Sequence, residues 1–469
     1  MDDFNSWKLL SQQNMGATRA LAKFIVELRT RVIPEETQAV IRKALIDAIG
    51  CGLYGLTTPW SRIIRNYASE QGGLPKVGLW GTGQLVSVEQ SVLSSGTAIH
   101  SFDFDDHSRA KIHPGAIVIP VALAMAEVHK VSGTVLMAAI TAGYETMNRV
   151  SQAANPSRTR MRGWHLTGTC GTFAAAACAS VILGLDEETT ASALGLAGTQ
   201  SAGLWAFTAD GSMSKRIHPG RAAQAGVTAA YLALSGFEGP RQILEAEDGS
   251  FLFAMSDTPR PERITESLGT LWHSDATCFK PHACCGSNHA CVDAAIELMN
   301  EHHLDVSDVE SVIAGIASVV KTQTGFEYKA DSVLNAQMSL SYNIAVAIFD
   351  RQVYLEQFTN DRIVDPQVFA LVKKIQIEID PDIDRAYPEI YGGKVDIITK
   401  SGKRFSRKVN YSRGMPENPM SQEDIERKFM SLATAAVGLE RAANILTLSK
   451  NVFDAESVDS LNALLTQPL

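Results

Sequence analysis

Two short histidine-bearing stretches carry the side chains most able to do chemistry. The first, residues 100–115, places three aspartates beside His107 and His113, and the second, residues 162–172, places His165 among glycines. Imidazoles and carboxylates are costly to bury without partners, and histidine titrates near neutral pH and transfers protons. These stretches indicate an enzyme that moves protons on a small substrate.

Each stretch also has a simpler interpretation. Asp103, Asp105 and Asp106 are compatible with a divalent-cation site or with polar groups capping a helix end. The Asp-x-Asp-Asp run matches no calcium-loop pattern, so we expect no metal. His165 at a helix start either faces a cleft, where the helix N-terminus favours a substrate anion, or is a structural histidine with satisfied hydrogen bonds.

Two further segments offer cations. Residues 213–221 contain Lys215, Arg216, His218 and Arg221 and precede an apolar helix, and Lys280 precedes Cys284 and Cys285. Lysine and arginine in a cleft bind substrate carboxylates, whereas such groups on a surface form a solvated face. We do not expect covalent catalysis by the cysteines, since free cysteine is commonly an inert buried residue.

Composition and missing motifs exclude several classes. A net charge of −9 argues against nucleic acid as the main partner. The chain has no Gly-x-Gly-x-x-Gly, P-loop, His-Glu-x-x-His or Gly-x-Ser-x-Gly pattern, so nucleotide cofactors and serine hydrolysis lack support. The seven cysteines include no Cys-x-x-Cys pair, which favours a reducing compartment. The N-terminus lacks a signal pattern, and apolar stretches such as 172–185 look too short and alanine-rich to span a bilayer, so we expect a cytoplasmic protein without a membrane partner.

Hydrophobic periodicity predicts a mainly α protein with an inserted α+β unit. We expect a helical domain at 1–270, a smaller α+β lid domain at 271–412, and a return to the helical domain at 413–469. One predicted helix starts at Pro34. Further predicted helices cover residues 91–100, 118–129, 134–150, 172–185, 222–235, 287–300 and 339–354. Predicted strands cover 309–319, 372–379 and a hairpin at 394–399 and 404–411, and Ser421 opens a capping box.

In combination, these stretches resemble the MmgE/PrpD family, which includes 2-methylcitrate dehydratases, cis-aconitate decarboxylases and an iminodisuccinate epimerase. The resemblance covers nearly the whole chain. It rests on Asp-Phe-Asp-Asp with His-Pro-Gly (103–115), Gly-Tyr-Glu (143–145), Gly-Trp-His with Gly-Thr-Cys-Gly-Thr (163–172), Lys215 with Gly-Arg (220–221), Lys280 with His289, and Tyr342. It implies a homodimer and cofactor-free chemistry in a cleft between a helical domain and a lid.

The resemblance also implies roles for residues. His165, Asp103, His113, Lys215 and Tyr342 match catalytic positions. Lys280 and His107 match substrate contacts, and Arg149 and Arg221 are further candidate carboxylate ligands; His107 stands where many relatives carry a threonine after the Asp-Asp pair.

We expect a cofactor-independent lyase that decarboxylates a cis-aconitate-like acid or dehydrates a 2-methylcitrate-like acid. Proton transfer at the carbon next to a carboxylate would be common to both reactions. The alternatives are an epimerase of a dicarboxylate such as iminodisuccinate, and a non-catalytic polycarboxylate-binding protein. The motifs do not distinguish these reactions, because one pocket could support each of them.

Overall fold

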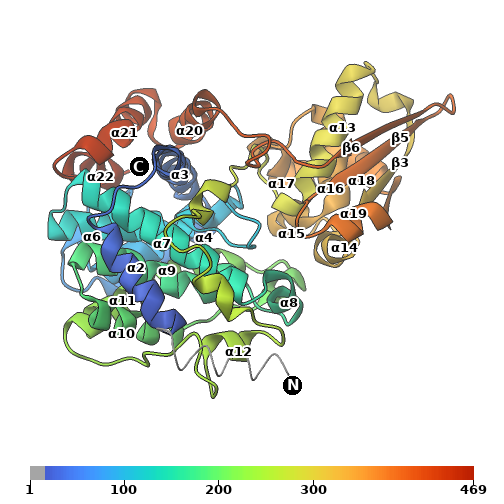
Figure 1. The fold of residues 1–469 in the computed structure, drawn as a ribbon. Helices are drawn as coiled ribbons and strands as arrows, with labels where there is room; N and C mark the ends of the chain where they lie inside the picture. Colours follow the sequence, from blue (N-terminus) through green and yellow to red (C-terminus); the bar gives the residue numbers. More distant parts are fainter. Residues whose placement is uncertain (1–15) are drawn as a thin grey trace.

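The computed structural model describes residues 16–469, and the prediction of a mainly α protein is confirmed. Figure 1 shows a helical part on the left and a smaller unit containing a sheet on the right. The principal helices of the helical part are α2 (Ala17–Leu28), α3 (Glu35–Gly55), α4 (Pro59–Gln71), α5 (Val88–Ile99), α6 (Gly115–His129), α7 (Gly133–Ala153), α8 (Pro156–Met161), α9 (Leu166–Leu183), α10 (Glu187–Gly198), α11 (Ser214–Leu234) and α12 (Phe251–Met255). A two-residue ladder, β1 (Val77–Gly78) with β2 (Leu85–Val86), joins α4 to α5.

Helix α9 is the centre of the helical part. It packs against α6, α7, α10 and α11, and its alanine and glycine residues allow these axes to approach closely. The helix begins at Leu166, six residues before the predicted start, because His165 rather than the later Gly-Thr turn is its N-cap. Among the described residues, α9 is the one helix long and apolar enough to cross a membrane, and 94% of it is buried inside the protein. The expectation that this stretch is too short to span was therefore wrong on length, and its burial makes it a core helix.

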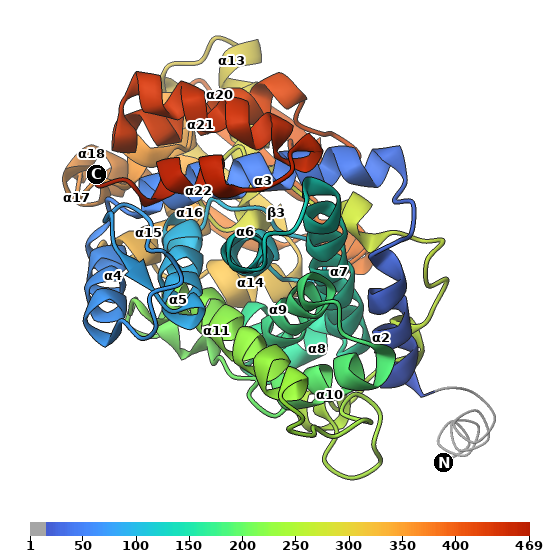
Figure 2. The same cartoon turned by 90° about the vertical axis from the view of Figure 1, so that its left-hand side faces the viewer.

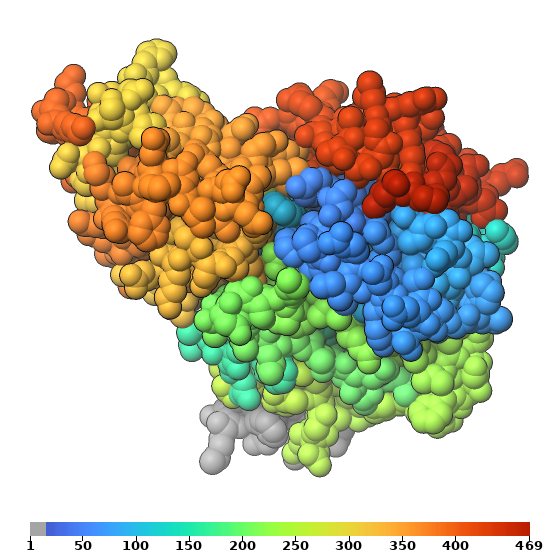
Figure 3. Space-filling model, turned by 180° about the vertical axis from the view of Figure 1, so that it is seen from behind, coloured from blue at the N-terminus to red at the C-terminus, as the bar shows by residue number. Residues whose placement is uncertain are grey.

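The smaller unit is built around one mixed sheet. Strands β3 (Val309–Ile316), β4 (Ile375–Ile379), β5 (Gly393–Thr399) and β6 (Arg404–Val409) lie in the order β4-β3-β5-β6, with β3–β4 parallel and the other pairs antiparallel. The helices of this unit are α13 (His289–Glu301), α14 (Ser318–Thr324), α15 (Val333–Met338), α16 (Leu340–Asp350), α17 (Asn360–Ile363), α18 (Pro366–Val372) and α19 (Pro381–Ala386). Helix α13 packs on β5 and β6, and α16 contacts both α13 and β4. Figure 3 shows this unit, in yellow and orange, beside the blue and green helical part.

After β6 the chain returns to the helical part. Helices α20 (Gln422–Val437), α21 (Leu439–Asn451) and α22 (Asp459–Thr466) lie near α3 in Figure 2, and both α20 and α21 pack on α3. Ser421 and Asp424 form the predicted capping box, in which each side chain bonds the other residue's backbone N–H. The strand-rich segment is thus inserted between helices that pack together.

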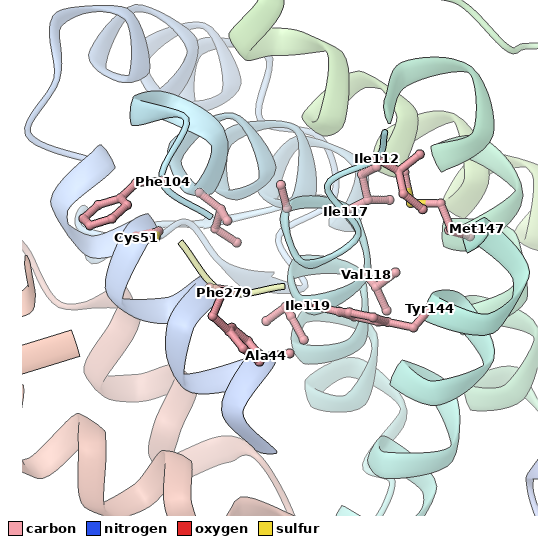
Figure 4. Packing of buried hydrophobic residues seen from close by; sticks show 14 of the residues in the cluster. Ala44, Cys51, Phe104, Ile112, Ile117, Val118, Ile119, Tyr144, Met147 and Phe279 are labelled. Carbon is pink, nitrogen blue, oxygen red and sulfur yellow. The ribbon is translucent and has the colours of Figure 1, made fainter. Parts of the chain in front are cut away.

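A buried ion pair fastens the returning helix to the core. Lys428 of α20 lies 2.7 Å from the Asp47 carboxylate of α3, and its ammonium also donates to the Phe104 carbonyl at 2.6 Å. The Phe104 ring lies 3.9 Å from the same ammonium and 4.9 Å from the Tyr354 ring. Figure 4 shows Phe104 beside Cys51 in this core. The loop that contains Asp103 is therefore held from behind by the C-terminal helices.

Candidate active site

Backbone pairing brings together site segments that are distant in sequence. The N–H of His107 donates to the Cys278 carbonyl at 2.9 Å, and the N–H of Cys278 donates to the His107 carbonyl at 2.7 Å. This pairing places Lys280 beside the aspartate loop. The backbone N–H of His165 donates to the Gly203 carbonyl at 3.0 Å, and the backbone N–H of Trp205 donates to the Gly163 carbonyl at 2.8 Å, so these two segments lie side by side.

Close helix packing places Lys215. A Cβ on Gly220 of α11 would lie 2.2 Å from the Leu93 carbonyl of α5, so only glycine allows these two helices to touch here. His100 follows the end of α5 directly, and Lys215 lies in the first turn of α11. The contact between the helices therefore delivers the Lys215 ammonium to the His100 ring.

Asp103 is the centre of the charged cluster. Its Oδ1 accepts from Lys215 Nζ at 3.0 Å and from Lys280 Nζ at 2.9 Å, and Lys280 also donates to the Asp103 carbonyl at 2.7 Å. All three residues are buried. Asp103 has a left-handed backbone, φ 52°, which aspartate tolerates better than most residues.

The two ammonium groups determine the charge of this aspartate. Burial alone raises the pKa of Asp103, but Lys215 and Lys280 outweigh burial and hold the pKa well below its usual range. Burial lowers the pKa of Lys215, whereas for Lys280 the attraction of Asp103 outweighs burial and raises the pKa. Two ammonium groups thus share the Asp103 carboxylate, and both line the cavity in which a substrate anion would bind.

His100 and His113 connect Asp103 to a second carboxylate. His100 Nε2 lies 2.9 Å from the Lys215 ammonium, and its Nδ1 lies 3.0 Å from the Asp105 carboxylate. Because the ammonium can only donate, Nε2 is bare and the hydrogen is on Nδ1. Burial lowers the pKa of His100 to about 3, so the ring is neutral. His113 lies between the two carboxylates, 3.6 Å from Asp103 and 3.3 Å from Asp105.

Asp106 has a structural position beneath this loop. Its carboxyl accepts from the Tyr144 hydroxyl at 2.9 Å and from the Gly115 N–H at 3.1 Å. Burial, with the charges of Asp47 and Asp105, raises the pKa of Asp106 well above its usual value. A Cβ on Gly115 would lie 2.1 Å from this carboxyl, which accounts for the glycine of the His-Pro-Gly motif.

His165 is a buried, neutral imidazole beside this charge. Its side chain is nearly inaccessible, and its ring packs against both Trp205 and Phe207, with centroids 5.4 and 5.5 Å away. Burial lowers the pKa of His165 well below its usual value, and the neighbouring His218 and Lys215 lower it further. A neutral imidazole has one bare nitrogen that can accept a proton, and it can donate the hydrogen on the other nitrogen when the bare one is protonated in the same step.

One cavity that holds the charged cluster lies between the two parts of the molecule. Asp103, His107, His113, His165, Lys215 and Lys280 line it from the helical part and the segment that follows. The smaller unit contributes Cys285, Gly286, Ser287, Gln323, Met338 and Tyr391. His107 approaches Gly286 so closely that a Cβ there would lie 3.0 Å from the imidazole. Six of the nine residues named from the sequence therefore share one hollow.

The other three lie away from that cavity. The Tyr342 hydroxyl donates to the Gln357 carbonyl at 2.5 Å, and its ring packs on Tyr328 inside the smaller unit. Arg149 is fully buried, bonds Glu145 at 3.2 Å and donates to backbone carbonyls near residues 264–271. Arg221 lies on the surface of α11 beside Gln224. Each has a structural partner that accounts for it.

Sequence reasoning missed several cavity residues. Lys111, Trp205 and Tyr391 line the cavity but were not among the candidates, and neither was His100, which opens the first motif and contacts Lys215. His218 was named only as one of the cations of residues 213–221. His218 follows Lys215 by three residues, a spacing that puts both on one helix face. Lys111 and Tyr391 reach the cavity from loops, and no periodicity gives their direction.

The same cluster has the composition of a cation site. Ligand atoms of His100, Asp103, Asp105 and His113 lie within 4.8 Å of one another. However, Lys215 is 3.0 Å from the Asp103 oxygen and 2.9 Å from the His100 nitrogen, so an ammonium already lies among those ligands. Its positive charge opposes a divalent ion, and the arrangement fits a charge and proton network better than a metal centre.

Comparison with known proteins identifies the family of this chain. The chain matches the MmgE/PrpD N-terminal domain over residues 19–263 and the MmgE/PrpD C-terminal domain over residues 282–453. It is 28% identical to a cis-aconitate decarboxylase of Aspergillus terreus over 98% of both chains. It is 27% identical to the cis-aconitate decarboxylase of Homo sapiens, covering 96% of this chain and 95% of that protein. The cis-aconitate decarboxylase-like protein oryM of Aspergillus oryzae is 27% identical over similar lengths. This chain belongs to the MmgE/PrpD family.

Proposed function

We propose that the chain is a cofactor-independent lyase that decarboxylates cis-aconitate or a closely similar tricarboxylate. The observation that carries this proposal is the cavity in which Lys215 and Lys280 share the single carboxylate of Asp103 beside the neutral His165. The names of the full-length relatives support the same reaction.

The lysines bind and stabilise negative charge. A tricarboxylate enters a pocket whose lining includes two buried ammonium groups and a third on Lys111 at the loop. When the carbon–carbon bond to the leaving carboxylate breaks, carbon dioxide departs and the electron pair shifts through the adjacent double bond toward another carboxylate. Preorganised donors in a water-poor site stabilise such developing charge strongly, by about 10²- to 10³-fold in rate for each donor.

The reaction then needs one proton at carbon. His165 is the imidazole best placed to deliver it, because His100 has both ring nitrogens engaged and His113 lies between two carboxylates. The ring of His165 lines the cavity and is kept neutral by burial. One carbon dioxide leaves and one proton enters, so the atoms and charges balance without an added electron acceptor.

Proton NMR in heavy water tests the proposal. With cis-aconitate we expect loss of the vinyl signal, appearance of two methylene signals on a new terminal double bond, and one deuterium on the neighbouring saturated carbon. His165→Gln is expected to abolish this change, while Lys130→Met, which alters an exposed ion pair with Asp459, leaves it intact.

The other candidate reactions give distinct results. Turnover of 2-methylcitrate without release of carbon dioxide would show that the protein is a dehydratase and not a decarboxylase. Deuterium exchange into iminodisuccinate stereoisomers without net loss would indicate an epimerase. Equal tricarboxylate binding by the wild type and His165→Ala, with no turnover, would favour a binding protein.

A further inference from the structure

A second histidine lies directly behind His165. Nδ1 of His165 is 2.8 Å from Nδ1 of His218, which lies in α11 one turn after Lys215. His218 is half-buried, whereas His165 is 2% exposed. The Phe207 ring packs on both imidazoles, with centroids 5.5 Å from His165 and 6.1 Å from His218. His218 is therefore the polar neighbour of His165 on the side away from the cavity.

A hydrogen bond between two Nδ1 atoms couples the two rings. One Nδ1 carries the hydrogen and the other accepts it, so two neutral rings hold opposite tautomers. When His218 donates, His165 carries its own hydrogen on Nε2 and is an acid toward the cavity. When His165 donates, its Nε2 is bare and is a base.

Both rings are neutral at neutral pH. Burial lowers the pKa of His218 to about 4, and Lys215 adds to this effect. The other groups around His218 are the backbone at Gly168 and Gly203 and the ring of Phe207, and none of these carries charge. Two neutral rings that carry their hydrogens on different nitrogens can pass a proton from one to the other without either ring becoming charged.

We propose that His165 and His218 form a proton relay, in which His218 takes from solvent the proton that replaces the one His165 gives to the substrate carbon. The proposal rests on the proposed function, because decarboxylation consumes one proton from water in every turnover. His165 gives its Nε2 hydrogen to carbon, its Nδ1 receives the hydrogen of His218 Nδ1, and His218 Nε2 takes a proton from water. One proton passes from solvent to product, and both rings end neutral with exchanged tautomers. After product release, one proton entering at His165 Nε2 and one leaving to solvent at His218 Nε2 restore the starting tautomers.

Substitution of His218 separates relay from positioning. In His218→Asn the amide lies where Nδ1 was and keeps a hydrogen bond to His165, but it cannot pass a proton through a ring. We expect kcat on cis-aconitate to fall about 10²-fold, within the range for general acid–base groups, while KM changes less than about threefold. His218→Ala should lose as much kcat and recover part of it with added imidazole. Gln224→Ala, farther along α11, is the matched control and should be unchanged.

Two results would overturn the relay. If His218→Asn keeps the wild-type kcat and pH profile, His218 only positions His165. If His218→Ala loses kcat but imidazole restores none of it, the ring is structural.

A measurement without substrate distinguishes this proposal from the proposed function. In protein labelled with ¹⁵N-histidine we expect a scalar coupling across the Nδ1–H···Nδ1 bond and opposite tautomers for the two rings, both lost in His218→Asn. If the coupling is present but cis-aconitate is not turned over, the paired rings stand and the substrate assignment fails. If cis-aconitate is turned over but the coupling is absent, the relay fails and the function stands.

Discussion

Replacing Lys428 with methionine should destabilise the protein in a strongly pH-dependent way. The Lys428 side chain is 4% exposed, and its partner Asp47 is fully buried. Without Lys428 the Asp47 carboxylate loses the cation that opposes the effect of burial on its pKa. Removing one partner of a buried ion pair typically costs about 3–5 kcal/mol.

The pH dependence follows from the state that Asp47 then adopts. Burial already raises the pKa of Asp47, and in Lys428→Met the carboxyl folds in its protonated form. Protonating a carboxyl with an unfolded pKa near 3.9 costs about 4 kcal/mol at pH 7, at about 1.4 kcal/mol for each pH unit. The folded pKa is raised, so the stability deficit relative to wild type grows as pH rises. It should shrink by about 1.4 kcal/mol for each unit between pH 8 and pH 6.

Equilibrium urea denaturation at pH 8, 7 and 6 measures this effect. Lys450→Met is the matched control, because its pair with Glu426 is on the surface of the same C-terminal helices and should cost less than about 1 kcal/mol. Asp47→Asn combined with Lys428→Met should recover most of the loss at pH 8, since no charge is left buried. A deficit independent of pH, or a double variant no more stable than Lys428→Met, would refute the reasoning.

Four further outcomes are expected. Lys280→Met should lower kcat/KM about 10²- to 10³-fold through loss of an ammonium that stabilises substrate charge, and an unchanged kcat/KM would show that Lys280 takes no part in the reaction. Burial lowers the pKa of His218 in the folded protein to about 4, so its contribution to the free energy of unfolding is present above about pH 6.5 and is lost as pH falls toward 4. Urea denaturation should therefore show that the free energy of unfolding of His218→Asn falls less steeply with decreasing pH than that of the wild type. Identical pH slopes for the two proteins would contradict this. A chelator should leave turnover unchanged, whereas inactivation reversed by a divalent ion would show that a cation displaces the Lys215 ammonium from its place beside Asp103. Tyr342→Phe should keep kcat/KM within about threefold, because its hydroxyl bonds Gln357 inside the smaller unit, and a large loss of kcat would return Tyr342 to the catalytic group.

Much of the fold could be predicted because its local signals are strong. The period-two pattern and the Lys-Ser-Gly-Lys turn identified the hairpin β5–β6, and Ser421 with Asp424 identified the start of α20. Helix starts were less accurate. Helix α11 begins at Ser214, eight residues before the predicted start, and continues through Pro219, because close packing on α5 outweighs the backbone bond that proline cannot make.

The candidate site was predictable in composition but not in direction. The resemblance to the MmgE/PrpD family placed Asp103, His165 and Lys280 in one set, and they share a cavity. It could not show that Arg149 turns to backbone carbonyls, since that depends on a loop more than a hundred residues later. Membership of the MmgE/PrpD family is confirmed. The catalytic roles, the domain boundaries, the homodimer and the cytoplasmic location stay predictions.

The contact between Lys428 and the Phe104 carbonyl also has a temporal consequence. The two residues are 324 positions apart, so Lys428 is synthesised long after Phe104. At about 5–20 residues per second, a nascent chain waits on the order of tens of seconds between synthesis of the two. During that interval the aspartate loop lacks its anchor and Asp47 lacks its counterion. Emergence of α20, rather than of the first helices, sets the moment at which the aspartate loop gains its anchor.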